Sequence, residues 1–542
     1  MQIDTQNVDH LGLIAGMCEE IGLVDLIDQT VGDQAKNKHL TYGQAIKCMI
    51  LNGLGFVSRT LHMYSEYFED KPIDHLLGTP VIPEQIDDNV LGRALDKLFE
   101  LGVTELFTKI ALHTIKVLGI QVKSLQLDAT SFHVVGNYES LLEQGEACIR
   151  LVQGYSRDHR PDLNQAVLQL ITSNEGNIPL YMQVADGNSS DKTAFTQIVA
   201  EHLKSFRQAV ENRYIVGDSA LYTSATLQAF KEEQSLFVTR VPMQIKEAKE
   251  LMFEVPYDKT IEIAEGYRAF ESTSCYAGVE QRWVAIFSQA AYQRECHTVA
   301  KHYLKGSEKE TKVFIKLMQQ EFSCPNDAKR QLDKFVKKLK YIQIIEPQII
   351  ATQKHAKSGR PKSGQAPSIL SYRLEGTVAC SLLNKAELEK IKGFFIILAT
   401  NDMDMTAFPA QEVLKTYKAQ QSVERGFRFL KSPDFLVSSF FLKKPERIEA
   451  LLMVMTLCLL VYSTLEYEIR EKLRENGENF LNQLKKPTQK PTIRWVFFCF
   501  LGLHMVFIDH KRLQITNLKE RHRIILRCLG PPYQKFYYSE MW

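Results

Sequence analysis

The chain has 542 residues with 66 Lys or Arg and 64 Asp or Glu, and its net charge of +2 excludes a uniformly basic nucleic-acid-binding surface. A DNA-binding function would therefore need a local basic patch. Charged residues make up 24% of the chain and hydrophobic residues 45%, which is ordinary for a globular protein, and the length allows two to four domains.

Residues 1–118 lack the alternation of β-strands and are predicted to be helical. Thr41 is a plausible N-cap for a helix that follows it, and apolar residues recur at helical spacing in 87–99 as well. A helical N-terminal domain of this size is either a helix-turn-helix-type DNA reader or a packing and dimerisation module. The residues alone leave both alternatives open.

From residue 120 the hydrophobic period changes to that of strands. Five apolar or alternating runs predict strands, and they are 122–128, 165–172, 178–184, 214–218 and 236–241. The second and third are joined by a hairpin connection, and helices are predicted at 191–206 and 227–233. The order strand, hairpin, helix, strand, helix, strand is typical of an α/β fold with an RNase H-like core, a mixed sheet covered by helices.

Pro242 ends this pattern, and 242–391 is interpreted as an insertion that splits the core. It is expected to contain a hairpin at 267–287, two charged helices, a basic loop and a strand at 370–380, before a strand at 392–400 returns to the core. Between Lys329 and Arg373 there are eleven Lys or Arg and two acids. This basic run is either a solvated face or a surface that follows a nucleic-acid backbone.

Within that run, Gly359-Arg360-Pro361-Lys362 resembles the core of an AT-hook. Extended Arg-Pro segments fit the narrow minor groove of DNA, where the potential is most negative. A single copy leaves two alternatives, minor-groove contact by Arg360 and Lys362 or a flexible basic loop.

A helix is predicted between Pro409 and Pro433, up to about 23 residues long, because Pro favours a helix start and restricts the residue before it. Tyr417, Glu424 and Lys431 are seven residues apart in it and would project from nearly one side. Arg428 lies one turn beyond Glu424.

The most apolar stretch, Ala450–Val461, has twelve residues, well short of the ~20 that span a bilayer. It is therefore predicted to be a buried helix, and no membrane partner is expected. The ten cysteines form no CxxC pair or zinc spacing, and no secretory leader is evident at the N-terminus, so we expect reduced thiols and a cytoplasmic protein. The expected segments are 1–118, 119–241, 242–391, 392–470 and a helical C-terminal region, 471–542.

Three acids stand in distinctive settings. Asp128 and Asp218 end predicted strands, and Glu424 lies on the late helix. Alone, each aspartate is equally a strand-end cap or turn former. Together they suit a site for Mg²⁺ or Mn²⁺, which take hard oxygen ligands, and two such ions can activate the attacking and stabilise the leaving oxygen in phosphodiester chemistry.

These blocks resemble the DDE transposases of bacterial insertion sequences, over roughly residues 120–470. More narrowly the chain is similar to the insertion-sequence-four superfamily, whose signature is Tyr-x2-Arg-x3-Glu-x6-Lys. Here the signature positions hold Tyr417, Gln420, Glu424 and Lys431, so glutamine replaces the arginine. The resemblance implies catalytic and metal-binding roles for Asp128, Asp218 and Glu424, and phosphate contacts for Tyr417 and Lys431, with Gln420 at the position of a further contact.

The same resemblance implies metal-dependent cleavage of element ends and strand transfer into target DNA. Its expected partners are the terminal inverted repeats and target DNA, bound by a homodimer or higher assembly that joins two ends. Arg428 is a further candidate for phosphate contact. His159 and Arg160, in a polar loop between core strands, either lie against DNA or form a turn closed by salt bridges to nearby aspartates.

Two rival functions remain open from the sequence. One is a metal-dependent nuclease with the same fold that cuts without strand transfer. The other is a catalytically silent DNA-binding descendant, against which the presence of all three acids argues.

Overall fold

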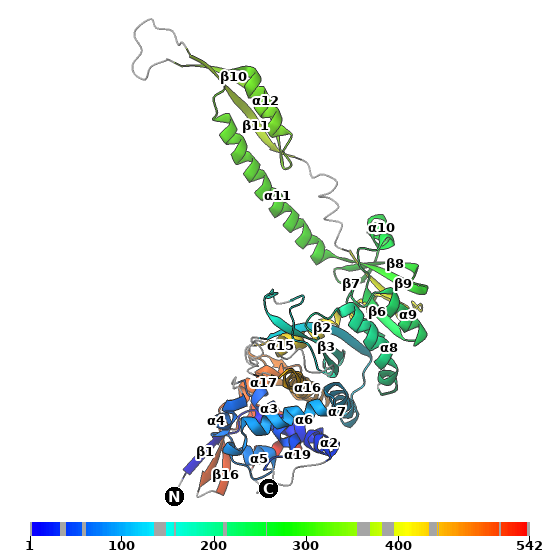
Figure 1. Cartoon of the computed structure of the whole chain (residues 1–542), viewed down its shortest axis with the longest axis vertical. Coiled ribbons are helices and arrows are strands. Elements are labelled where there is room, and N and C mark those ends of the chain that lie inside the picture. The colour runs from blue at the N-terminus through cyan, green and yellow to red at the C-terminus, as the bar shows by residue number, and fades with distance from the viewer. Residues whose placement is uncertain are drawn as a thin grey trace. The chain divides into compact units, whose positions relative to one another are not determined.

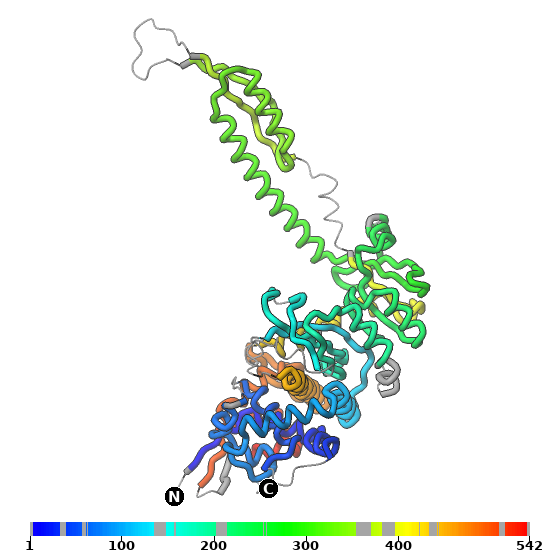
Figure 2. The backbone as a smooth tube through the Cα atoms, in the orientation of Figure 1, coloured from blue at the N-terminus to red at the C-terminus, as the bar shows by residue number. Residues whose placement is uncertain are grey.

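The computed structural model describes residues 3–32, 39–56, 61–134, 148–156, 159–209, 214–255, 257–354, 369–381, 395–432, 442, 444–508 and 511–538. By their contacts the residues form two compact units. Unit 1 comprises Met1–Arg240, Thr273–Arg282 and Leu398–Trp542, and unit 2 comprises Val241–Ser272 and Trp283–Ile397. The path of the chain can be followed in Figure 2.

The N-terminal part of unit 1 is mainly helical, as predicted. Its helices are α1 (Leu11–Glu20), α2 (Leu23–Val31), α3 (Tyr42–Leu54), α4 (Tyr64–Phe68), α5 (Ile73–Leu77), α6 (Asp88–Glu100) and α7 (Val103–Val117), with short 3-10 turns η1 (Leu61–Met63) and η2 (Pro83–Gln85). The predicted helix start at Thr41 is confirmed, because its side chain accepts from the Gln44 N–H in a reciprocal capping box. Asp87 caps α6 in the same way through the Val90 N–H at 2.7 Å.

The two ends of the chain depart from the expected all-helical character. Strand β1 (Ile3–Asn7) pairs antiparallel with β15 (His504–Ile508), which pairs with β16 (Lys511–Thr516). The remaining C-terminal elements are β13 (Phe480–Leu481), β14 (Pro487–Thr488), α17 (Ile493–Phe500), α18 (Glu520–Leu529) and α19 (Pro531–Gln534). These strands are too short to show a period, and the partner of β1 lies about 500 residues away, so no local pattern could reveal the sheet.

The predicted buried helix is confirmed as the centre of α16 (Pro445–Glu475), which packs against α1, α3, α6, α7 and α18. By length and composition α16 is the one described helix that could cross a membrane, but 83% of its most apolar window is buried inside the protein. Helix α16 is therefore the central buried helix of unit 1, and helices from the N-terminal and C-terminal parts of the chain pack around it (Figure 1).

A large mixed sheet follows the helices. Its strands run in the order β4-β3-β2-β5-β6-β12-β9-β8-β7. The predicted core elements are all present, as β2 (Ser124–Val134), β3 (Asn164–Ser173), β4 (Pro179–Ala185), α8 (Asp191–Ala209), β5 (Tyr214–Gly217), α9 (Ser224–Glu232), β6 (Leu236–Arg240) and β12 (Phe395–Thr400). Strands β2, β5 and β6 are parallel neighbours, whereas β3 and β12 flank them antiparallel.

The hairpin of β8 (Tyr267–Tyr276) and β9 (Val279–Ser288) is placed differently from the prediction. Both strands belong to the large sheet, and the tip, Thr273–Arg282, groups with unit 1. The sequence analysis had assigned the whole hairpin to an insertion. Strand β9 is buried along nearly its whole length, which is typical of an interior strand and explains why it joins the sheet.

Unit 2 contains a long helix with a small core of its own. Its elements are α10 (Lys246–Glu254), η4 (Tyr257–Lys259), β7 (Ile261–Ala264), α11 (Gln289–Met318), α12 (Pro325–Val336), β10 (Ile342–Lys354) and β11 (Ile369–Cys380). Helices α11 and α12 pack on the β10–β11 hairpin (Figure 1). Phe314, Ala328, Leu332 and Leu374 form the buried cluster between them.

The prediction of a single helix between Pro409 and Pro433 is wrong, because the segment forms two helices. The structure has two helices, α14 (Ala410–Lys418) and α15 (Gln421–Leu430), separated by a tight turn in which the Gln420 N–H donates to the Tyr417 carbonyl at 3.1 Å. No Gly or Pro marks the break. The break lies where the packing partners of the chain change. Helix α14 packs on β5 and β6, whereas α15 packs on β2, β3 and α16.

Candidate functional site

Two of the candidate acids, Asp128 and Asp218, lie in one lateral row with Arg240, at one level of three neighbouring parallel strands. In the printed register, Leu127 of β2 is paired with Gly217 of β5, and Gly217 with Thr239 of β6. The next residue on each chain is Asp128, Asp218 and Arg240. Because residues level with each other on neighbouring strands point to the same face, these three side chains share one face of the sheet.

Asp128 does not end its strand, contrary to the prediction. Strand β2 continues to Val134, because β3 pairs with it over its whole remaining length. The neighbouring strand β5 ends at Gly217, the residue before Asp218. The Asp128 carboxylate is 8% exposed and accepts the Ala129 N–H at 2.8 Å.

Local hydrogen bonds hold the second aspartate at the end of β5. The Asp218 carboxylate accepts the Ala220 N–H at 2.8 Å, and its carbonyl accepts the Thr239 hydroxyl at 2.7 Å. The second bond ties the turn after β5 to β6, where Thr239 is fully buried. The backbone of Asp218 is thus held by two adjacent strands.

The two late helices cover this row. Glu424 is exposed on α15, and Tyr417 lies near the end of α14. Burial raises the pKa of the Tyr417 hydroxyl, the Arg240 charge opposes that rise, and the carboxylates of Asp218, Glu424 and Asp128 add to it. The side chains of Arg240, Asp218, Glu424 and Asp128 thus all influence the pKa of the Tyr417 hydroxyl.

The carboxylates suit Mg²⁺ or Mn²⁺ in chemistry, since carboxylate oxygens are the ligands these ions prefer. Within the described residues, however, no group of three or more His, Cys, Asp or Glu side chains lies close enough to hold an ion. An Mg²⁺ ion needs only one or two protein carboxylates when substrate phosphates and water supply the rest.

Arg240 is the residue that the sequence analysis missed. It is exposed, ends β6 one residue after the Gly217–Thr239 pair, and its positive charge lowers the pKa of the Tyr417 hydroxyl. The sequence signal that could have identified Arg240 is a positive charge near the end of the predicted strand 236–241. Gln420, at the arginine position of the signature, is only 9% exposed and precedes α15.

The two remaining helix candidates differ in exposure. Arg428 is exposed on α15. Lys431 is half-buried at the end of α15, and its ammonium lies 5.6 Å from the centroid of the Phe132 ring. Phe132 and Asp128 are four residues apart on β2 and share a face, so Lys431 lies over the same side of the sheet as the aspartates.

The polar loop before β3 is closed by an ion pair. Arg160 donates to both carboxylate oxygens of Asp162, at 2.9 and 2.8 Å, and this pair raises the pKa of Arg160. His159 is exposed with a φ of +59°. The salt-bridged turn is the alternative that this geometry favours, and DNA contact by Arg160 would require the pair to open. Arg360 and Lys362 lie outside the described residues.

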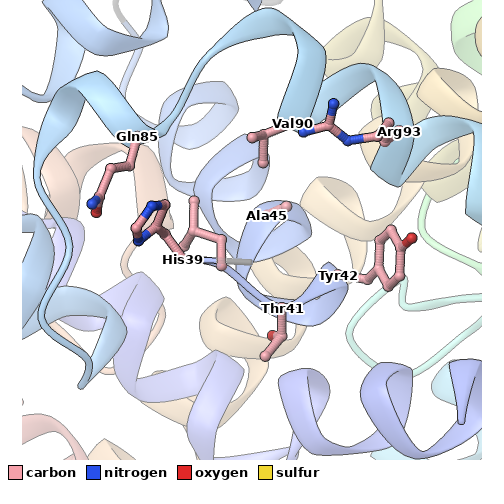
Figure 3. A pocket seen from close by; sticks show the side chains of 8 residues that line it. His39, Thr41, Tyr42, Ala45, Gln85, Val90 and Arg93 are labelled. Atoms are coloured by element: carbon pink, nitrogen blue, oxygen red, sulfur yellow. The ribbon is translucent and has the colours of Figure 1, made fainter. Parts of the chain in front are cut away.

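A small cavity of about 100 Å³ lies between the start of α3 and α6 (Figure 3). It is lined by His39, Leu40, Thr41, Tyr42, Ala45, Gln85, Val90 and Arg93. None of these belongs to the carboxylate row, so the cavity is not part of the candidate site.

Comparison with known proteins follows the same division of the chain. The family model described as "Transposase DDE domain" matches residues 125–461, and the one described as "Domain of unknown function (DUF4277)" matches residues 3–112. No curated protein matches the chain.

Two solved structures are similar at low scores. A piggyBac transposase synaptic complex with hairpin DNA has 10% identity and a TM-score of 0.36, covering 93% of this chain and 83% of that one. A Mos1 transposase paired-end complex with the left transposon end has 10% identity and a TM-score of 0.13, covering 37% of this chain and 59% of that one.

Proposed function

Because the chain belongs to the DDE transposase family, whose model matches residues 125–461, we propose that it moves an insertion sequence by cutting the element ends and joining them to target DNA. Members of this family are DNA transposases and generally use divalent metal ions. The finer assignment, to the insertion-sequence-four superfamily, is supported by the spacing of Tyr417, Glu424 and Lys431 in the signature.

One observation carries the proposal. Asp128 and Asp218 directly follow two residues that pair on adjacent parallel strands, and α15, which bears Glu424, packs on β2, the strand that carries Asp128. A row held between adjacent strands meets the precision that a catalytic site needs. In the chain, residues 241–397 separate strands β2 to β6 from the helix that bears Glu424. This order supports an RNase H-like core that is interrupted by an insertion.

In the proposed mechanism Asp128, Asp218 and Glu424 would hold Mg²⁺ or Mn²⁺, two ions by our proposal, which would supply charge stabilisation at the attacking and leaving oxygens. Water attacks the phosphorus at the element end, the P–O3′ bond breaks, and a 3′-hydroxyl is freed. That hydroxyl then attacks a phosphorus of the target DNA, a P–O bond forms between element and target, and the target P–O3′ bond breaks with release of a target 3′-hydroxyl. Arg240, Tyr417 and Lys431 hold the phosphates beside the row.

Arg240 supplies the positive charge that the signature places at position 420. Gln420 is neutral and largely buried, whereas Arg240 is exposed at the level of Asp218. A guanidinium binds phosphate through two parallel hydrogen bonds, which suits a group that must orient a phosphodiester. The N-terminal helices would recognise the terminal repeats, and a homodimer or larger assembly would bring two ends together.

The test of the function uses DNA that carries the sequences flanking the reading frame. With Mg²⁺, the protein should cut at the element ends and then join pre-cut ends to a plasmid, both read on sequencing gels. Cutting without joining would identify the nuclease alternative. Binding without any metal-dependent cutting would identify the silent descendant.

For Arg240 we expect Arg240→Gln to lower the cleavage rate about 10- to 100-fold, because a hydrogen bond to a charged group contributes about 1.5–3 kcal/mol and each 1.36 kcal/mol is a tenfold change in rate. Arg240→Lys should be milder. Single-turnover cleavage and a thermal melt measure the effect, with Arg474→Gln, an exposed arginine paired with Glu471, as the control. Wild-type cleavage by Arg240→Gln would remove Arg240 from the site.

A further inference from the structure

Helix α11 of unit 2 carries a stripe of exposed cations along its length. The stripe consists of Arg294, Lys301, Lys305, Lys309, Lys312 and Lys316, all exposed. At about 100° per residue these six side chains fall within about 80° of one another around the helix, and they extend over about 33 Å. We call them the α11 stripe.

The rest of the helix fixes the direction of the stripe. Ser307 and Phe314 are the buried residues of α11, and by the same helical geometry they lie opposite the stripe. On the packed side, the Glu310 carboxylate accepts the N–H groups of Tyr341 at 3.0 Å and Ile342 at 3.1 Å. Gly306 lies against the Tyr341 ring, where a Cβ would come within 2.5 Å. Rotation of the helix would break these contacts, so the cations face away from the hairpin.

The charges of the stripe are not neutralised by the described surroundings. None of the six cations forms an ion pair within 4 Å with an acid that the structure describes. One acid, Glu308, lies at the edge of the stripe. Residues 289–380 hold seventeen Lys or Arg and eight Asp or Glu, although the whole chain has a net charge of only +2. Positive charge is thus concentrated in this part of unit 2.

We propose that the α11 stripe binds the phosphate backbone of double-stranded DNA without reading its sequence, at a site separate from the carboxylate row. The inference uses the proposed action on DNA only to choose among anionic partners. Duplex DNA presents about one negative charge per 1.7 Å of its axis, and the stripe spans about one helical turn of it.

The composition of the stripe favours this partner. Five of its six members are lysines, which act as flexible point charges on phosphates rather than as planar forks that read base edges. A folded acidic protein would have to present a matching straight row of carboxylates, whereas every DNA duplex has one row of phosphates on each strand. The proposal applies to α11 the second of the two alternatives for the basic run from Lys329 to Arg373, a surface that follows a nucleic-acid backbone.

The experiment compares two triple variants of the full chain. The first, Lys305→Gln, Lys309→Gln and Lys312→Gln, removes half of the stripe at nearly equal helix propensity. The control, Lys485→Gln, Lys486→Gln and Lys490→Gln, removes the same charge from exposed positions around β13 and β14 in unit 1. Binding to a labelled 30-base-pair duplex of arbitrary sequence is measured by fluorescence anisotropy from 50 to 200 mM NaCl in EDTA, so that no cleavage occurs.

Each phosphate contact contributes about −0.9 to the slope of log K against log salt, so three lost contacts should make the slope shallower by about 2.7. Between 50 and 200 mM salt, the advantage of the wild type over the stripe variant should therefore shrink about 40-fold. The control should keep the wild-type slope. Circular dichroism and thermal melts of both variants verify folding.

A stripe variant with the wild-type slope would overturn the proposal, and so would a control that loses as much as the stripe variant. A change of oligomeric state in light scattering without DNA, at an unchanged slope, would instead assign the stripe to contacts between copies of the chain. Because these measurements contain no metal, their outcome is independent of whether the carboxylate row cuts DNA.

Discussion

Replacing Asp128, Asp218 or Glu424 by its amide should lower metal-dependent DNA cleavage by at least about 10³-fold, with DNA binding retained. Charge stabilisation by bound metal ions is a matter of several kcal/mol, and about 4 kcal/mol corresponds to a thousandfold. The amides keep the size of the side chains. In Asp128→Asn the amide oxygen would still accept the Ala129 N–H, and in Asp218→Asn it would still accept the Ala220 N–H, so the local turns that now hold both carboxylates should persist.

The measurement is single-turnover cleavage of element-end DNA with Mg²⁺, beside anisotropy binding of the same DNA. Glu412→Gln is the matched control for Glu424→Gln, because Glu412 is an exposed acid on α14 that pairs with Lys415 at 3.1 Å. It should cleave like the wild type. If one of the three amide variants cleaves at a near-normal rate, that acid is not part of the site.

Gly187→Ala should destabilise unit 1 by about 3 kcal/mol or more. A Cβ at this position would lie 2.1 Å from the Gln165 carbonyl oxygen and 2.2 Å from the Val152 carbonyl oxygen. Both obstacles are backbone atoms, so the strand or the loop must move, and overpacking of this kind costs about 1–3 kcal/mol or occasionally more. The Gln165 side chain also donates to the Gly187 carbonyl at 2.7 Å, and this bond would be strained.

The apparent Tm by differential scanning fluorimetry should fall by about 4 °C, because an unfolding entropy of ~2.1 cal/mol/K per residue gives roughly 1.2 °C per kcal/mol for a unit as large as unit 1. Gly426→Ala is the control. Its Cβ would meet only the Leu459 side chain, at 3.1 Å, and Ala gains about 1 kcal/mol of helix propensity. A Gly187→Ala protein that melts with the wild type would show that the loop before β3 adapts at little cost.

Short-range signals in the sequence were enough to predict many elements. The cap at Thr41 and the apolar period that follows it predict α3, and the strand order up to β6 follows from alternation and hairpin residues. The apolar run Ala450–Val461 predicts a buried helix, but α16 as a whole is long and apolar enough to cross a membrane, so its packing against the other helices decides its burial. For α3 and the strands up to β6, the deciding residues lie within one turn or one strand of each other, so local chemistry is sufficient.

The three acids were also found from the sequence, because their spacing resembles a family signature. Their assembly depends on strand register, which no local pattern states. Asp128 and Asp218 are level only because Leu127 pairs with Gly217, and Arg240 joins them because Thr239 pairs with Gly217. A shift of one residue in either pairing would turn these side chains to the opposite face.

What only the tertiary structure decided has one physical cause. The pairing of β1 with β15, the entry of the β8–β9 hairpin into the large sheet, and the turn at Gln420 all depend on surfaces contributed by distant segments. Gln420 has no helix-breaking character, yet the helix ends there because α14 and α15 pack on different strands. The sequence by itself determined the three candidate acids and most of the local elements that bear them. Long-range packing determined how those elements align, because burial of apolar surface between distant segments outweighs the weak local preference of each.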